Sequence, residues 1–155
     1  MFTQTKILSS YRGVRHVRLL LLSLGGALGT AARYGVNGLI SEWQYHAWSA
    51  VFPLGTLIVN VSGCFAIGFL AAVSGPSMGR MWFSPEWRDF LMIGFCGGYT
   101  TFSSYGLQTL NLARDGEWFW IALNVGGSNV LGLLAVYLGR FCGLLLQSGL
   151  HGGMS

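Results

Sequence analysis

The sequence predicts an all-α integral membrane protein with four membrane-spanning helices. Of its 155 residues, 52% are hydrophobic and only 9% are charged, and the mean hydropathy is +0.53. A soluble domain usually carries about 25% charged residues. So few charges could not cover a water-facing surface, and the length suits a single domain. Lipid is therefore expected to be the main solvent of this chain.

Four apolar runs reach the roughly 20 residues that a helix needs to cross the hydrocarbon core. The predicted spans are residues 19–40, 54–73, 90–112 and 118–146, within a four-span domain at 19–150 that a basic flank at 1–18 precedes and a tail at 151–155 follows. A cleaved signal peptide is the alternative for the first run, because small residues follow its leucines. The run continues to span length beyond them, which favours a retained first span.

Basic residues are distributed unevenly between the two sides of the predicted spans. The cytoplasmic side would hold Lys6, Arg12, Arg15, Arg18, Arg80, Arg88 and Arg140, and the other side Arg114. The positive-inside rule therefore places both termini in the cytoplasm, with the N-terminal cluster beside anionic lipid headgroups. Nucleic-acid binding is not expected, because no aromatic-basic module follows the cluster.

Charged residues are nearly absent from the spans, and none of the four contains Asp or Glu. Proton-coupled transport commonly relies on an intramembrane carboxylate or histidine, so passive conduction is favoured over a proton-driven mechanism.

Arg33 lies about two-thirds along the first span. It is either an anchor that reaches the interface, a buried partner for backbone carbonyls, or an attractor of anions.

The third span is unusual because the segment CGGYTTFSSY places two glycines, two threonines and two serines in its middle. The pair Gly97-Gly98 is a poor helix former. Irregular backbone at that depth survives only inside protein or beside a water-filled cavity. We expect a helix broken mid-membrane, whose freed carbonyl oxygens could bind a hard cation. The alternative is an ordinary helix whose hydroxyls bond to their own backbone.

Polar side chains also occur at helical spacing in the second and fourth spans. Thr56 and Asn60 are four residues apart, as are Asn124 and Ser128, so each pair shares one helix face. The two faces could line a polar track. Hydrogen bonding between helices for packing alone is the other interpretation.

Three motifs together resemble the Fluc, or CrcB, family of fluoride channels over about residues 19–140. They are GGALGTAARY at 25–34, PLGTLIVNVSG at 53–63 and GFCGGYTTFSSY at 94–105. The resemblance implies an antiparallel, dual-topology homodimer with two pores and a central structural Na⁺ that is not transported. It also implies passive fluoride export across a bacterial inner membrane, with no enzymatic activity.

The resemblance also assigns individual residues. Gly97 and Thr100 match the positions whose carbonyls hold Na⁺, and Arg33 matches the arginine of the first helix. The implied fluoride pore comprises Thr56, Asn60, Thr101, Phe102, Ser103, Tyr105, Asn124 and Ser128. Tyr105 replaces a second pore phenylalanine, and Gly132 replaces a third polar residue of the track.

Two other classes of membrane protein fit less well. A small proton-coupled drug exporter would need an embedded carboxylate, which the spans lack. A non-conducting scaffold protein would not need a broken, hydroxyl-rich third span. Polar groups inside a membrane are read as functional by default, which favours a channel over both.

Overall fold

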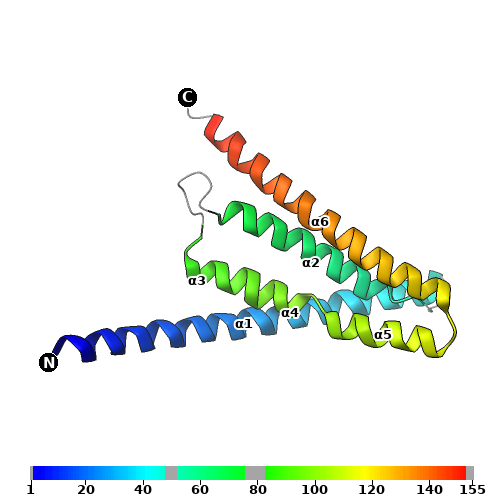
Figure 1. Cartoon of the computed structure of the whole chain (residues 1–155), viewed down its shortest axis with the longest axis horizontal. Coiled ribbons are helices and arrows are strands. Elements are labelled where there is room, and N and C mark those ends of the chain that lie inside the picture. Colours follow the sequence, from blue (N-terminus) through cyan, green and yellow to red (C-terminus); the bar gives the residue numbers. More distant parts are fainter. Residues whose placement is uncertain (1, 48–51, 76–82, 153–155) are drawn as a thin grey trace.

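All elements of the computed structural model are helices, which confirms the all-α part of the predicted fold class for the residues that it describes. These are residues 2–47, 52–75 and 83–152, with side chains described for 16–46, 52–75 and 83–149. The elements are α1 (Phe2–Ala47), α2 (Leu54–Val73), α3 (Pro85–Arg88), the π-helix η1 (Asp89–Cys96), α4 (Gly97–Tyr99), α5 (Phe102–Arg114) and α6 (Trp118–Gly152) (Figure 1).

Three of these helices are long and apolar enough to cross a membrane. The qualifying stretches within the described residues are His16–His46, Leu54–Val73 and Trp118–Gly149. The third predicted span, residues 90–112, is instead divided among η1, α4 and α5. The predicted interruption of this span is confirmed, and its pieces are each shorter than a membrane-spanning helix.

Two helices extend beyond the predicted membrane spans. The first span was predicted at residues 19–40, and α1, which contains it, extends from Phe2 to Ala47 and so includes most of the predicted basic flank. The last span was predicted at 118–146, and α6 extends to Gly152. Hydropathy indicates which residues lie in lipid. A helix can continue beyond the lipid where no helix-breaking residue interrupts it. Residues 2–18 contain no proline and only one glycine.

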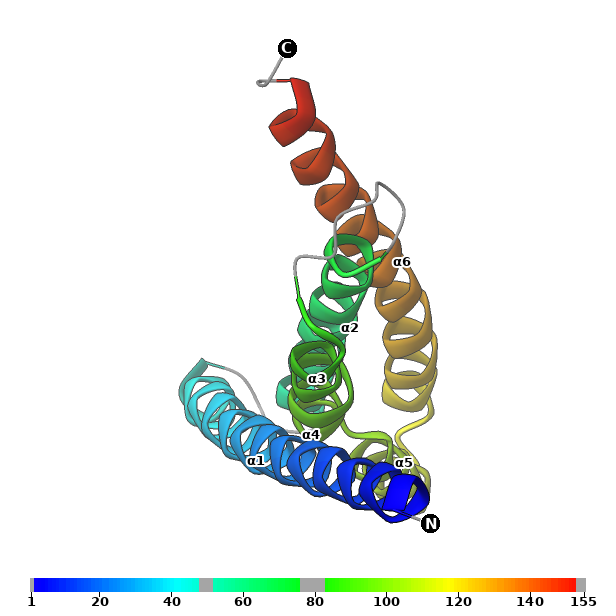
Figure 2. The same cartoon turned by 90° about the vertical axis from the view of Figure 1, so that its left-hand side faces the viewer.

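The helices associate mainly as two pairs. α2 packs chiefly against α6, and α1 packs against η1 and α4. Figure 2 shows α2 between α6 on one side and α1 on the other. An ion pair between Arg18 and Glu86, 3.5 Å apart, also connects α1 to α3. The broken segment therefore packs against other helices on both sides of the break. η1 and α4 lie along α1, and α5 contacts α6 and α2.

Glycines allow α1 and η1 to approach until their backbones touch. A Cβ atom on Gly29 would overlap the carbonyl oxygen of Phe95, and one on Gly25 would lie 2.6 Å from the carbonyl oxygen of Phe90. A Cβ atom on Gly94, on the η1 side of the contact, would likewise lie only 3.1 Å from the Cα of Gly25. The four-residue spacing of these glycines therefore serves close helix packing, as small residues do in lipid.

The outer faces of the bundle are apolar. Exposed large side chains include Leu39, Phe119 and Leu133, which are 71%, 71% and 74% accessible. Such surfaces are unsuited to water and fit either lipid or another protein surface. Together with the three apolar helices, they identify a membrane protein.

Candidate functional site

The break between α4 and α5 is formed by two extended residues. Thr100 has φ −79° and ψ 156°, and Thr101 has φ −147° and ψ 115°. The amide side chain of Asn60, on α2, pairs with both backbone groups of Thr101. Its Nδ2 donates to the Thr101 carbonyl at 3.1 Å, and its Oδ1 accepts from the Thr101 N–H at 2.8 Å. Asn60 thereby satisfies the Thr101 N–H, which the break leaves without a helical acceptor, and also bonds to the Thr101 carbonyl.

Thr101 also begins α5 as its N-cap. Its Oγ1 accepts from the backbone N–H of Ser104 at 3.2 Å, and the side chain is only 6% exposed. The hydroxyls of Ser103 and Ser104 lie 3.2 and 3.1 Å from the same oxygen. An N-cap hydroxyl of this kind contributes about 1 kcal/mol to helix stability. The hydroxyl-rich sequence therefore starts a new helix directly after the break.

The break leaves two backbone carbonyls without the N–H donors that a continuous helix would give them. In a continuous helix, the Thr101 N–H would bond to the Gly97 carbonyl and the Ser104 N–H to the Thr100 carbonyl. Both donors bond to side chains instead, those of Asn60 and Thr101. Gly97 and Thr100 are the residues that the resemblance assigns to a cation. A Cβ added to Gly97 would meet nothing within 4 Å, so this side of α4 is open.

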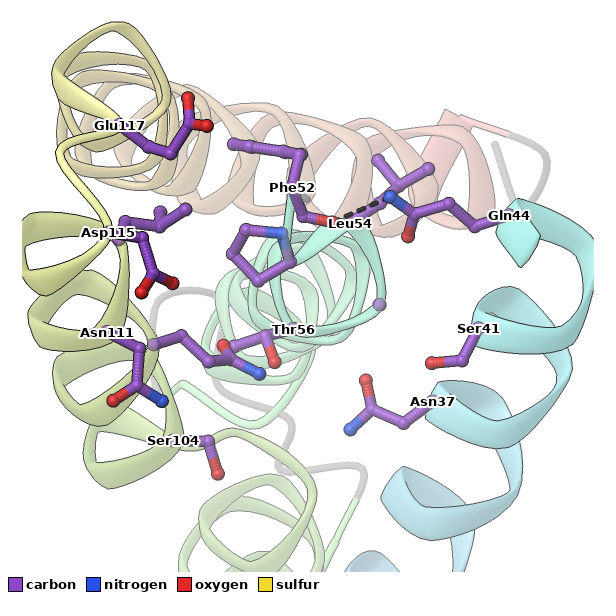
Figure 3. A pocket seen from close by; sticks show the side chains of 14 residues that line it. Asn37, Ser41, Gln44, Phe52, Leu54, Thr56, Ser104, Asn111, Asp115 and Glu117 are labelled. Atoms are coloured by element: carbon purple, nitrogen blue, oxygen red, sulfur yellow. Dashed lines mark hydrogen bonds between the residues drawn. The ribbon is translucent and has the colours of Figure 1, made fainter. Parts of the chain in front are cut away.

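A polar cavity of about 620 Å³ lies among α1, α2, α5 and the turn after α5. Its polar lining comprises Asn37, Ser41, Gln44, Thr56, Ser104, Gln108, Asn111, Asp115 and Glu117. Figure 3 shows the α1 side chains on one side of the cavity and the two carboxylates on the other. The described lining contains no Lys, Arg or His, so the cavity has a negative electrostatic character at neutral pH.

In the polar pair on α6, Asn124 has a hydrogen-bond partner and Ser128 has none among the described residues. Asn124 is fully buried, and its Nδ2 donates to Thr109 Oγ1 of α5 at 2.9 Å. Thr109 in turn donates to the Tyr105 carbonyl at 2.8 Å. Asn124 Oδ1 and Ser128 Oγ are buried and have no hydrogen-bond partner among the described residues. Buried polar atoms of this kind usually have a partner, so these two are available to one beyond the described residues.

The remaining predicted residues lie apart from this network. Phe102 is 84% exposed, and its ring lies 5.5 Å from that of Tyr105, centroid to centroid. Arg33 is half-buried and has no hydrogen bond or ion pair within the described residues. Thr56 faces the cavity and is only 3% exposed. The structure thus brings Asn60, Thr101 and Ser103 together, whereas Arg33 contacts none of these residues through a hydrogen bond or ion pair.

Several polar residues near these positions were not predicted from the sequence. Asn37, Ser41 and Gln44 have spacings of four and three residues, which places them on one face of α1 and could have identified them. Thr109 carries no such signal, because its role depends on a residue of another helix. Asp115 lies in the turn after α5, where Gly116 has a positive φ of 75°.

Comparison with known proteins places the chain in one family. The family described as CrcB-like protein, Camphor Resistance (CrcB), matches residues 20–140. A relative from Rhodospirillum rubrum is 46% identical over 130 residues, covering 84% of this chain and 97% of its own length. One from Opitutus terrae is 48% identical over 129 residues, covering 83% and 94%. Each is named a fluoride-specific ion channel, FluC, and not an enzyme. The resemblance carried by the three motifs is confirmed, and the chain belongs to the CrcB family.

Proposed function

We propose that this protein is a passive, fluoride-selective channel of the bacterial inner membrane that exports fluoride from the cytoplasm. The observation that carries this proposal is the likeness to fluoride-specific channels at 46–48% identity over nearly their whole length. The absence of Asp and Glu from the predicted spans supports passive conduction, because a proton relay would need such a group. Export relieves toxicity because hydrogen fluoride enters neutral and ionises inside.

The working unit is an antiparallel homodimer of four-span subunits. α1, α2 and α6 make three crossings, and η1, α4 and α5 together make the fourth. The exposed Phe102 ring, the open side of Gly97 and the apolar outer faces all support a second copy. A two-fold axis would give two equivalent pores, each lined by both subunits.

A Na⁺ ion at the centre of the dimer serves as a structural element and is not transported. Its ligands are the backbone carbonyls of Gly97 and Thr100 from each subunit, four oxygens in all. The proposal is supported by the redirected N–H groups of Thr101 and Ser104, which leave these two carbonyls without their helical donors. Carbonyl oxygens are suitable ligands for a hard cation, and the ion would supply positive charge without any carboxylate.

Fluoride moves along neutral polar groups and aromatic ring edges. The cavity that contains Thr56 forms the vestibule. Beyond it, Asn60 still has one free N–H, because an amide nitrogen carries two hydrogens and Thr101 uses one. Phe102 offers the positive edge of its ring, and Tyr105 adds a hydroxyl. Ser103, Asn124 and Ser128 complete the path, and Arg33 raises the potential for anions near one end.

Fluoride efflux from liposomes that contain only the purified protein tests this function. Efflux is followed with a fluoride electrode after valinomycin is added to carry K⁺, with equal pH on both sides and chloride as the comparison ion. We expect fast fluoride release and little chloride release. Efflux that occurs only with an imposed pH gradient would instead indicate proton-coupled exchange.

A further inference from the structure

We propose that Thr109, a residue with no assigned role, is a positioning residue that orients the Asn124 amide and holds α5 against α6. The inference rests on the proposed channel function, because Asn124 is one of the groups along the fluoride path. It begins from two short contacts, Asn124 Nδ2 to Thr109 Oγ1 at 2.9 Å and Thr109 Oγ1 to the Tyr105 carbonyl at 2.8 Å.

The chemistry of the three groups fixes the direction of both bonds. A threonine hydroxyl has one hydrogen, and a carbonyl oxygen can only accept. Once the Thr109 hydroxyl donates to the Tyr105 carbonyl, its oxygen can only accept from Asn124. The nitrogen of the Asn124 amide must therefore face α5, and its oxygen must face away from Thr109. Thr109 thus decides which end of a fully buried amide is presented in each direction.

This orientation matters because the two ends of an amide have opposite effects on an anion. An N–H attracts fluoride, whereas a carbonyl oxygen repels it. Asn124 has a second N–H, and its Oδ1 is buried with no partner among the described residues. Without Thr109 nothing in the described chain would hold the amide in one orientation. The two orientations would then compete, and the anion would meet the wrong end of the amide for part of the time.

The same contact also fixes the position of α5. Within the described residues it is the only side-chain hydrogen bond between α5 and α6. Asn60 holds the beginning of α5 through Thr101, and Asn124 holds its middle through Thr109. Tyr105 lies one turn before Thr109, on the same face of α5. Loss of the hydroxyl would therefore disturb Asn124 and Tyr105 together.

The test compares Thr109→Val, which keeps the shape but removes the hydroxyl, with Thr109→Ser, which keeps the hydroxyl. Removing one partner of a buried amide typically changes a rate or equilibrium by about tenfold. We expect Thr109→Val to lower fluoride efflux by about that factor and to reduce the preference for fluoride over chloride. Thr109→Ser should restore most of the efflux. Asn129→Leu is the matched control, because the exposed Asn129 bonds only to Val125 of its own helix, at 2.7 Å.

A double-mutant cycle separates positioning from general damage. In an Asn124→Ala background, Thr109→Val should have little further effect, because the amide that it orients is gone. The proposal is overturned if Thr109→Val conducts like the wild type, if Thr109→Ser is as poor as Thr109→Val, or if the two effects add fully. Should Thr109→Val not fold, Thr109→Ala takes its place, and failure of both to fold would indicate a purely structural role.

The outcome is distinguishable from failure of the channel proposal itself. If wild-type liposomes release no fluoride, the proposed function is wrong. The Thr109–Asn124 contact is then still measurable through thermal unfolding in detergent of the wild type, Thr109→Val, Asn124→Ala and the double variant. Coupling between the two positions in that measurement would support the contact, and its absence would overturn it.

Discussion

Asn60 has a structural role in the fold and a proposed role in the ion path. The resemblance assigns it to the pore, and the structure places both ends of its amide against the backbone of Thr101. That pairing joins residues 41 positions apart in the chain, which no local pattern could have revealed. The sequence could therefore identify Asn60 as a candidate site residue, but it could not identify Thr101 as its hydrogen-bond partner.

Asn60→Asp should nearly abolish fluoride efflux, for two reasons. A carboxylate cannot donate to the Thr101 carbonyl, and it repels an anion strongly where water is scarce. Efflux from liposomes measures the effect, with circular dichroism as a check that the helices remain. Asn129→Asp is the control, because Asn129 is exposed and bonds only within α6. Wild-type efflux in Asn60→Asp would remove Asn60 from the pore.

Phe102 and Tyr105 allow the aromatic part of the path to be tested separately. Phe102→Ala removes the exposed ring edge, and we expect at least about a tenfold loss of efflux from the loss of one transition-state contact. Tyr105→Phe keeps the ring and removes only the hydroxyl, so we expect a working channel. The ratio of the fluoride and chloride efflux rates would show whether the hydroxyl contributes to selectivity. An inactive Tyr105→Phe would contradict this interpretation.

The broken third span shows how far helix-level features follow from the sequence. The Gly97-Gly98 pair predicted an interruption, and the interruption occurs two residues later, at Thr100 and Thr101. Glycine weakens a helix, but the break falls where Asn60 can replace the lost backbone bond. The full length of α1 did not follow from hydropathy, because hydropathy indicates which residues lie in lipid and not where a helix begins or ends. Gly25 and Gly29, in contrast, have the four-residue spacing that is typical of close helix packing in lipid, and both lie where α1 meets η1.

Gly29→Ala should separate α1 from η1, because its methyl group would overlap the Phe95 carbonyl oxygen, and a backbone atom cannot move aside cheaply. Overpacking of this kind costs about 1–3 kcal/mol or more, so we expect a lower unfolding temperature in detergent. Gly35→Ala lies on the same helix and meets nothing within 4 Å, which makes it the matched control. Equal melting temperatures for the two variants would contradict the close contact.

In the molecule as a whole, the polar cavity that we propose as the vestibule has a negative character although the proposed cargo is an anion. Asp115 and Glu117 line it, with no basic residue among its described lining. Asp115→Asn combined with Glu117→Gln should therefore raise fluoride efflux at about 10 mM salt, where the Debye length is roughly 30 Å, and much less at 1 M. Glu86→Gln is the control: it removes the partly exposed ion pair with Arg18 but leaves the charge of the cavity lining unchanged. An effect that is equal at both salt concentrations would rule out an electrostatic origin.

The length of α1 also provides a way to observe which direction each molecule faces. A helix of 46 residues is about 69 Å long, whereas the hydrocarbon core is about 30 Å thick. If residues 19–40 fill that core, the preceding 17 residues from Phe2 extend roughly 25 Å from its edge, into the aqueous phase. A single reporter there, such as Lys6→Cys after replacement of the three native cysteines, marks the orientation of its own subunit. In sealed vesicles, a membrane-impermeant thiol reagent should then label about half of the subunits of a dual-topology dimer. Labelling of all or none would show a single orientation.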